Sequence, residues 1–204
     1  KKEVLRFLIV WIQTLFSPLI TSLLFLSVLS LAIGNDRGDV LGVPFIVFLA
    51  PGLIAMQIIQ QAFSHSSSSF MIGKIQGNIV DLLYAPLSAG EVTLAVTLAS
   101  VTRSVLIAAI SLLVFYLFID LEIKNLKTLI AFTLLSAFSL GALGIIAGLW
   151  AEKFDHMATV TNFIIIPLSF LSGTFYSIER LPEVLQIISK ANPFFYMIDG
   201  FRYS

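Results

Sequence analysis

Cysteine is absent from the sequence, and charged residues are scarce. None of the 204 residues is cysteine, which excludes disulfides and thiolate metal sites. Charged residues make up 12% of the chain, against roughly a quarter in soluble domains. The formal net charge is zero, so the composition gives no indication of nucleic acid as a partner. Apolar residues reach 58%, a composition that favours a membrane protein.

Sequence motifs for catalysis are also missing. There is no Gly-x-x-x-x-Gly-Lys-Ser/Thr to hold ATP phosphates, and neither His-Glu-x-x-His nor Gly-x-Ser-x-Gly occurs. His65 and His156 stand alone, and we expect ordinary loop histidines rather than metal ligands. The serine run 66–69 has no base beside it and is interpreted as a flexible loop or helix cap. We therefore predict that the chain itself has no enzymatic activity, metal or cofactor.

Long apolar runs dominate the sequence. The stretch from Phe7 to Asn35 carries no charge, and four more apolar runs follow. An apolar run of about 18 residues or more is long enough to cross a bilayer as a helix. We predict an all-α polytopic membrane protein, residues 1–204 forming one transmembrane domain, with five spans: within Leu5–Ile33, then about Phe45–Phe63, Val92–Ile119, Thr128–Trp150 and Met157–Tyr176.

Prolines interrupt three of these runs. Pro18 divides the first, whose early part is either an interfacial amphipathic helix or the start of one long tilted span. Pro51-Gly52 predicts a kink or break in the second run, and Pro167 lies in the fifth. The basic residues are divided almost evenly between the segments predicted on the two sides of the membrane, but Lys1, Lys2 and Arg6 precede the first span. That cluster favours a cytoplasmic N-terminus.

The segment 64–91 is the longest polar interval between runs. Its apolar residues Ile75, Ile79, Leu82 and Leu83 recur at helical spacing, and Pro86 ends the pattern. Ser88-Ala89-Gly90-Glu91 is a capping-box pattern that begins the third span. The periodicity alone is compatible with an interfacial helix that only covers lipid or with a helix that docks a partner.

Arg103 is the only charge deep within a predicted span. It lies about 18 Å along a helix from Glu91. Inserting a charged side chain at that depth of the bilayer costs at least about 2.5–3.5 kcal/mol. We expect it to face protein or a wet cavity, as a buried brace or as part of a translocation path. The polar candidates around it, apart from carbonyls freed at Pro51, are Gln57, Gln60, Gln61 and Asn162.

Two further patterns concern packing and the membrane interface. Gly141, Gly144 and Gly148 suit close helix packing, within the chain or at a dimer seam. Residues 182–190 predict a second interfacial helix. The aromatic residues around it are typical of an interfacial belt: Tyr176, Phe194, Phe195, Tyr196, Phe201 and Tyr203.

Several segments together resemble the ABC-2 type permeases, the membrane subunits of type-2 ABC exporters. Each segment is degenerate, but their order and spacing cover essentially the whole chain. They are VLRF (4–7) with WIQT (11–14), FLAPGLI (48–54), KIQGNIVDLLYAPLS (74–88), FLSGTFYS (170–177), LP (181–182) and NPFFY (192–196).

The resemblance implies six spans, a cytoplasmic N-terminus in a bacterial inner membrane, and short re-entrant helices on the outer side. The sixth span is not in the sequence, which we expect to be a fragment. The family's coupling helix, which docks on a separate ATPase, would lie at about 75–84. It would include Ile75, Gln76, Asn78, Ile79, Asp81, Leu82, Leu83 and Tyr84. The aromatic residues of an implied outer gate are Phe175, Tyr176, Phe194, Phe195 and Tyr196.

The resemblance also implies partners and a function. Two ATPase subunits would hold ATP and Mg, and a second permease copy would complete a homodimer or close heterodimer in the bilayer. Substrates of the family are amphipathic: drugs, lipids or lipid-linked glycans. The alternatives are a self-contained secondary transporter or channel, for which an inverted repeat and several intramembrane charges are expected, and an intramembrane enzyme. The sequence shows no clear repeat and no paired catalytic groups at depth.

Overall fold

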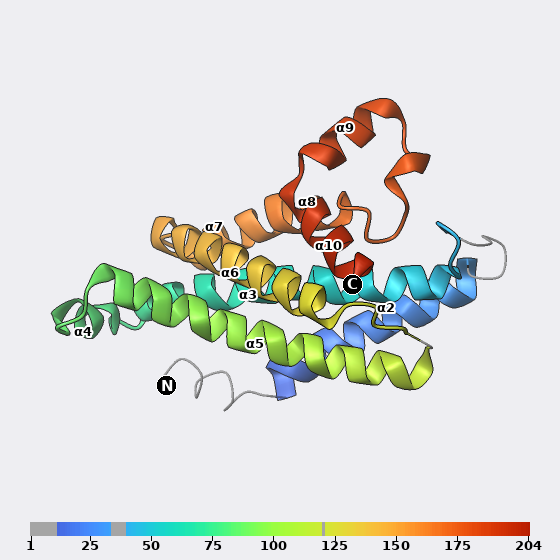
Figure 1. Cartoon of the computed structure of the whole chain (residues 1–204). Helices are drawn as coiled ribbons and strands as arrows, with labels where there is room; N and C mark the ends of the chain where they lie inside the picture. The colour runs from blue at the N-terminus through green and yellow to red at the C-terminus, as the bar shows by residue number, and fades with distance from the viewer. Residues whose placement is uncertain (1–11, 34–39, 120) are drawn as a thin grey trace.

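The chain folds as an elongated bundle of helices (Figure 1). The structure is a computed structural model that describes residues 12–33, 40–119 and 121–204, without the side chains of 12–13 and 81–83. Its long helices are α2 (Ser17–Ile33), α3 (Phe45–Ile75), α5 (Ala89–Phe118) and α6 (Leu126–Trp150). The shorter elements are η1 (Ile12–Phe16), α4 (Ile79–Tyr84), α7 (Phe154–Val160), η2 (Thr161–Ile165), α8 (Ile166–Phe170), η3 (Ile178–Arg180), α9 (Glu183–Ala191) and α10 (Pro193–Tyr203).

Helix α3 is the centre of the bundle, and α2, α5, α6 and α10 pack around it (Figure 1). In its most apolar stretch 72% of the residues are buried, against 28% in α5 and 22% in the first helix. The outward faces of α5 and α2 carry large apolar side chains such as Leu117 and Leu31. Such faces suit contact with lipid, because acyl chains offer no hydrogen bonds and the helices satisfy their own backbone.

Four helices in the described part of the chain are long and apolar enough to cross a bilayer: Thr14–Ala32, Phe45–Ile75, Ala89–Phe118 and Leu126–Trp150. They confirm an all-helical membrane protein and match four of the predicted spans. In the first, helix continues from Ile12 past Pro18 to Ile33. The choice between an interfacial helix and one long span rests on residues 1–11, which lie outside the described residues. Pro51 does not break α3, so of the predicted kink or break the break is wrong.

The predicted fifth span at Met157–Tyr176 is not among these four. Helical structure begins at Phe154 and ends at Phe170, through α7, the π-helical turn η2 and α8. Pro167 lies just after η2, and a proline removes an N–H and crowds the preceding turn. A turn follows in which Gly173 has φ +71, a left-handed conformation that glycine adopts without strain. The helix therefore ends six residues earlier than predicted.

The second span is longer than predicted. It continues twelve residues beyond Phe63, to Ile75, so the serine run 66–69 is helical rather than a loop or cap. The Ser67 hydroxyl donates to the Ser64 carbonyl at 3.3 Å, and the Ser68 hydroxyl to the His65 carbonyl at 3.1 Å. These hydroxyls donate to carbonyls of their own helix, so they are compatible with a helical backbone here. The small serine side chains also admit a second backbone beside them.

That second backbone belongs to α6. A Cβ added at Gly144 would lie 2.5 Å from the Phe63 carbonyl oxygen, and one at Gly148 would lie 2.8 Å from that of Ser67. Glycine is needed because the α6 backbone lies directly on the α3 backbone. The glycine pattern therefore packs two spans of the same chain together, as one of the two sequence interpretations predicted.

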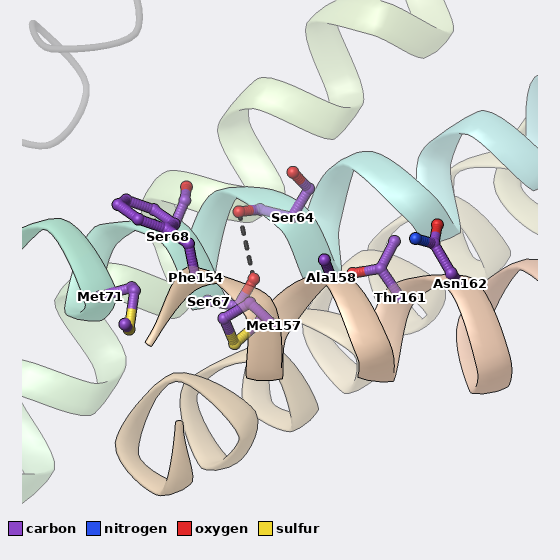
Figure 2. A pocket seen from close by; sticks show the side chains of 9 residues that line it. All are labelled: Ser64, Ser67, Ser68, Met71, Phe154, Met157, Ala158, Thr161 and Asn162. Atoms are coloured by element: carbon purple, nitrogen blue, oxygen red, sulfur yellow. Dashed lines mark hydrogen bonds between the residues drawn. The ribbon is translucent and has the colours of Figure 1, made fainter. Parts of the chain in front are cut away.

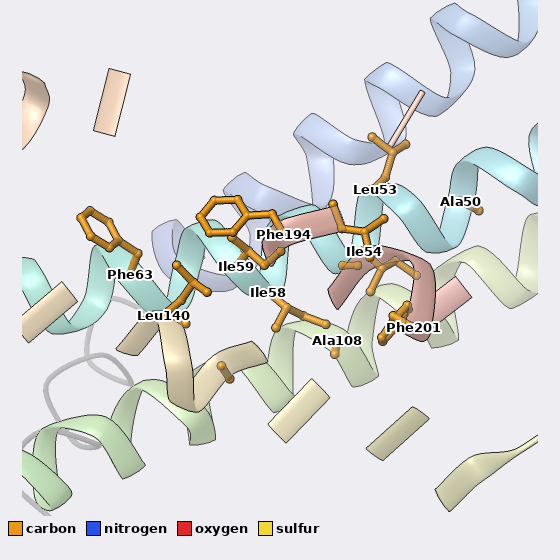
Figure 3. Close-up of a cluster of buried hydrophobic side chains, with 14 of the residues drawn as sticks. Ala50, Leu53, Ile54, Ile58, Ile59, Phe63, Ala108, Leu140, Phe194 and Phe201 are labelled. Carbon is orange, nitrogen blue, oxygen red and sulfur yellow. The ribbon is translucent and has the colours of Figure 1, made fainter. Parts of the chain in front are cut away.

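The other half of α3 is packed side chain against side chain. Figure 3 shows Ile54, Ile58 and Leu53 of α3 beside Phe194 and Phe201 of α10 and residues of α5 and α6. These side chains are buried. The C-terminus is held at this side as well, because the backbone N–H groups of Lys124 and Asn125 donate to the Ser204 carbonyl at 2.8 and 3.0 Å.

The bundle thus has two distinct ends (Figure 1). The "α4 end" contains the end of α3, α4, the start of α5 and the turn 151–153 between α6 and α7. The "opposite end" contains the turn 40–43, the connection 121–125 between α5 and α6, and Ser204.

Candidate translocation path and coupling segment

A polar stripe runs along one face of α3. Each member lies three or four residues from another member, which places them all on one side of the helix. They are Gln57, Gln60, Gln61, Ser64, Ser67 and Ser68. From the first to the last the stripe is about 16 Å long, at 1.5 Å per residue. Two cavities lie along it, one on each half.

The larger cavity, of about 380 Å³, lies between the second half of α3 and the helices α7 and η2 (Figure 2). Ser64, Ser67 and Ser68 line one wall. Asn162 and Thr161 contribute an amide and a hydroxyl on the other wall, together with apolar atoms from Met157, Phe154 and Ala158. The lining mixes hydrogen-bonding groups with apolar surface and has no formal charge.

The smaller cavity, of about 150 Å³, lies between α2 and α3. Gln60 and Gln61 line it together with Ser17, Thr21 and Ser22. Gln57 lies at its edge and donates from its side-chain nitrogen to the Pro18 carbonyl. The Gln57 amide therefore ties α3 to α2.

Arg103 points from α5 to this stripe. Its guanidinium donates to the Gln61 side-chain oxygen at 2.6 Å and lies 3.4 Å from Nδ1 of His65. Gln61 is one of the polar candidates that the sequence offered, and it lies one turn beyond Gln57. His65 is 1% exposed and lies within α3, so its prediction as a loop histidine was wrong. It follows Gln61 by four residues, so extending the helical period past Phe63 would have found it.

The five predicted path residues do not meet at one point. Arg103 and Gln61 form a pair, Gln57 bonds α2, and Gln60 faces the smaller cavity. Asn162 lines the larger cavity from η2. The five residues are distributed along the polar stripe and the wall that faces it. No group of three or more metal-ligating side chains occurs in the described residues.

The predicted coupling segment is divided into two parts. Ile75 is the last residue of α3, and Gln76–Asn78 form a turn in which Gly77 has φ +73. The helix that follows, α4, is therefore shorter than the predicted 75–84. Gly77 permits the left-handed backbone that reverses the chain here, which the helical periodicity of 75–83 does not reveal.

Helix α4 is exposed on one side and anchored on the other. Ile79 packs on the cluster of Phe70, Val96 and Ile145. Val80 is 48% exposed and Tyr84 is 87% exposed. The side chains of Asp81, Leu82 and Leu83 are outside the description.

Both sides of the α4 segment are fastened. The predicted capping box is present: Ser88 accepts from the Glu91 N–H at 3.3 Å, and the Ser88 N–H donates to the Glu91 carboxylate at 2.7 Å. On the other side Lys74 donates to the Ala151 carbonyl at 2.9 Å and to that of Leu149. These carbonyls are at the C-terminal end of α6, where a cation is favourable. The turn 151–153 is therefore tied to the start of the α4 segment.

The predicted gate aromatics occupy three different places. Phe175 lies between the rings of Phe25 and Phe170, at centroid distances of 5.9 and 5.2 Å. The Tyr176 hydroxyl donates to the Phe170 carbonyl at 3.1 Å. Phe194 is buried in the core, whereas Phe195 and Tyr196 contact each other edge-on at 5.2 Å.

Arg202 was not singled out from the sequence. Its guanidinium donates to the Gly173 carbonyl at 2.9 Å and to the Thr174 carbonyl at 3.4 Å. It lies over the Phe48 ring at 3.9 Å. Burial lowers the pKa of Arg202 to about 10, and Asp199 opposes this, so the group is charged at neutral pH. The only feature of the sequence that marked Arg202 was its position in a segment rich in aromatic residues.

Comparison with known proteins identifies the family. The family model for ABC-2 type transporters matches residues 1–204. The chain belongs to the ABC-2 type transporter family. The inner membrane transport permease YadH of Escherichia coli (strain K12) is 34% identical over 202 residues, which are 99% of this chain and 79% of YadH. Nodulation protein J of Rhizobium leguminosarum bv. trifolii is 26% identical over 194 residues, which are 94% of this chain and 73% of that protein. No solved structure gives a significant match.

Family membership determines the general activity. The protein is a membrane permease of an ABC-2 type transporter. Permeases of this family have no ATPase activity of their own, in agreement with the absence of a phosphate-binding loop from the sequence. ATP is bound in such systems by a partner ATPase.

Proposed function

We propose that the chain is the membrane-spanning subunit of an ATP-driven exporter and that α4 is the surface that receives the partner ATPase. The observation that carries this is the α4 segment. It is a short helix at one end of the bundle with an exposed aromatic and aliphatic face, held on both sides by Lys74 and the Ser88–Glu91 box. A surface anchored in this way transmits a push to α3, α5 and α6 together instead of bending.

The proposed assembly contains two permease copies and two ATPases, with ATP and Mg on the ATPases. Closure of the ATPase pair moves α4, and the movement reaches the path along α3. The α4 end and the N-terminus face the cytoplasm, which the basic residues Lys1, Lys2 and Arg6 favour. The name of the relative YadH supports a bacterial inner membrane. The segment α7–η2–α8 is proposed as a fifth span, since Phe154–Phe170 has about the shortest length that crosses a bilayer.

The proposed path follows the polar stripe of α3 and the facing wall of α7 and η2. Amides and hydroxyls alternate there with methionine and phenylalanine side chains. This lining suits an amphipathic substrate, which offers hydrogen bonds on one side and apolar surface on the other. The pair Arg103–Gln61 braces α5 against the stripe from behind. The aromatics Phe175, Tyr176, Phe194, Phe195 and Tyr196 are proposed as an outer gate.

The docking surface can be tested with an exposed pair. Val80→Asp combined with Tyr84→Asp changes two exposed side chains, whereas Ile79 is partly buried against Phe70. We expect the double variant to insert normally and to lose copurification with the ABC ATPase and ATP hydrolysis by the complex. Leu41→Asp with Val43→Asp, exposed at the opposite end, is the matched control and should retain both. Undiminished copurification by the α4 double variant would refute the docking role.

A further inference from the structure

The region around Arg202 brings together three elements that are distant in the sequence. These are the first third of α3, the turn that follows α8, and the end of α10. Arg202 of α10 bonds the Gly173 and Thr174 carbonyls of the turn and stacks on Phe48 of α3. One guanidinium therefore contacts all three.

Gly52 of α3 makes this arrangement possible. A Cβ at Gly52 would lie 2.8 Å from Nη2 of Arg202 and 2.8 Å from the Thr174 carbonyl oxygen. A real Cβ does not come so close, so any side chain would displace the guanidinium, the turn or both. Pro51-Gly52, which predicted a break in α3, is instead the place where the turn and the arginine seat on an unbroken helix.

The chemistry of the contact is suited to holding one position. Arginine is planar, donates in fixed directions and stacks on aromatic faces, whereas lysine is a flexible point charge. Its acceptors here are backbone carbonyls, and no ion pair involving Arg202 occurs within the described residues. The carbonyls belong to the turn and the ring belongs to α3, so the guanidinium cannot keep both when the turn moves away from α3.

We propose that Arg202 is a latch that keeps the end of the bundle opposite α4 closed. The guanidinium holds the turn 171–176 and α10 on the Phe48–Gly52 face of α3, and this contact breaks when the path opens at that end. The latch itself is independent of the docking surface on α4. Its link to ATP rests on the proposed function.

A single cysteine at Thr174 reports on the latch. Thr174 is 0% exposed, and the native chain has no cysteine, so Thr174→Cys gives one buried thiol on a clean background. The protein is expressed with its ABC ATPase, and a membrane-impermeant maleimide is added from the periplasmic side without nucleotide. We expect slow labelling in the parent and a rate at least about tenfold higher with Arg202→Met, because opening of the segment limits access to the thiol.

Three further variants keep the test decisive where Arg202→Met does not insert. Gly52→Ala adds only the clashing methyl group and favours the helix, so it should also raise labelling of the thiol. Gly73→Ala is the matched control, because it lies in the same helix with nothing within 4 Å of the added Cβ. Arg202→Lys should give an intermediate rate, since lysine keeps the charge and loses the planar fork.

The outcomes separate the latch from the proposed function. Parent-like labelling of both Arg202→Met and Gly52→Ala would overturn the latch, as would an equal rise with Gly73→Ala. ATP and Mg should speed labelling in the parent complex. If the ATPase copurifies and hydrolyses ATP but labelling is unchanged by nucleotide, the link between the latch and the transport cycle is refuted. If no ATPase copurifies, the proposed function fails while the nucleotide-free result stands.

Discussion

The two halves of α3 are built on different principles. The half near the opposite end, around Ile54 and Ile58, fills its surroundings with large apolar side chains (Figure 3). The half near the α4 end carries serines and lies backbone to backbone on the glycines of α6. Apart from the close contact at Gly52, the first half is packed through large side chains, whereas the second half needs small residues where α6 lies on it. A bundle of this kind can keep a polar stripe at its centre without giving up close packing.

The two halves are also fastened by different cations. Lys74 holds the α4 end through carbonyls at the end of α6, and Arg202 holds the other half through the turn after α8. Lysine is a mobile point charge on a flexible stem, whereas arginine is planar and stacked on a ring. We infer that the α4 end tolerates movement while keeping its connection and that the Arg202 contact has two states, made or broken.

The largest expected loss of stability comes from removing volume in the apolar half. Ile54 is 0% exposed, and Ile54→Ala should reduce the free energy of unfolding by about 2–5 kcal/mol, because a cavity remains. Unfolding in detergent, followed by circular dichroism, measures the change. Ile146→Ala, at a 63% exposed position of α6, is the control and should be nearly neutral. Equal losses at both positions would contradict the account of this half.

Adding volume should be the damaging change in the other half. Gly144→Leu forces a side chain where a Cβ would already be 2.5 Å from the Phe63 carbonyl oxygen. We expect a loss of about 2–3 kcal/mol from overpacking and the resulting backbone shift. The same detergent unfolding assay applies. A Gly144→Leu protein as stable as the parent would show that α6 does not depend on backbone contact with α3.

A smaller effect is expected at Arg103. Arg103→Leu removes the donor to Gln61, and the loss should be about 1.5 kcal/mol, the low end of the net value of a hydrogen bond that involves a charged group. Arg103→Lys should retain part of this stability and part of transport, because the charge remains. The comparison of the two variants in unfolding and ATPase assays separates charge from geometry. A Leu variant that is fully stable and active would remove the role of a brace.

The smallest effect is expected at Lys74. Lys74→Met removes the cation from the end of α6, which should cost about 0.3–1 kcal/mol. Lys74→Arg should restore most of it, since a cation at this helix end is sufficient. Proteolysis of the turn 151–153 in membranes is the measurement, because the tie to the α4 segment protects it. Equal cleavage in the parent, Met and Arg proteins would argue against the tie.

Much of this fold was accessible from the sequence because membrane spans depend on local composition. The apolar runs predicted the ends of α5 and α6 to within three residues, and the Ser88–Glu91 pattern predicted the start of α5. The helical serine run was missed because its helix is stabilised by tertiary contact with Gly144 and Gly148. Local polarity predicts a loop there, and only the neighbouring helix reverses that prediction.

The candidate site was less predictable than the fold. The cost of a charge at mid-span indicated that Arg103 faces the protein, but the sequence did not choose Gln61 from the other polar candidates, since the partner depends on the rotation of α3 about its axis. That rotation is determined by packing against α6. Arg202 and Gly52 meet only after the chain has returned to α3 from far along the sequence, so no local pattern reveals the contact.

The most direct test concerns the side of the membrane on which α4 lies. Asn78 and Glu122 are both exposed, at the α4 end and the opposite end. In spheroplasts, an impermeant maleimide should label Glu122→Cys at once and Asn78→Cys only after permeabilisation. Immediate labelling of Asn78→Cys, with Glu122→Cys protected, would place α4 away from ATP and contradict its role as the coupling surface.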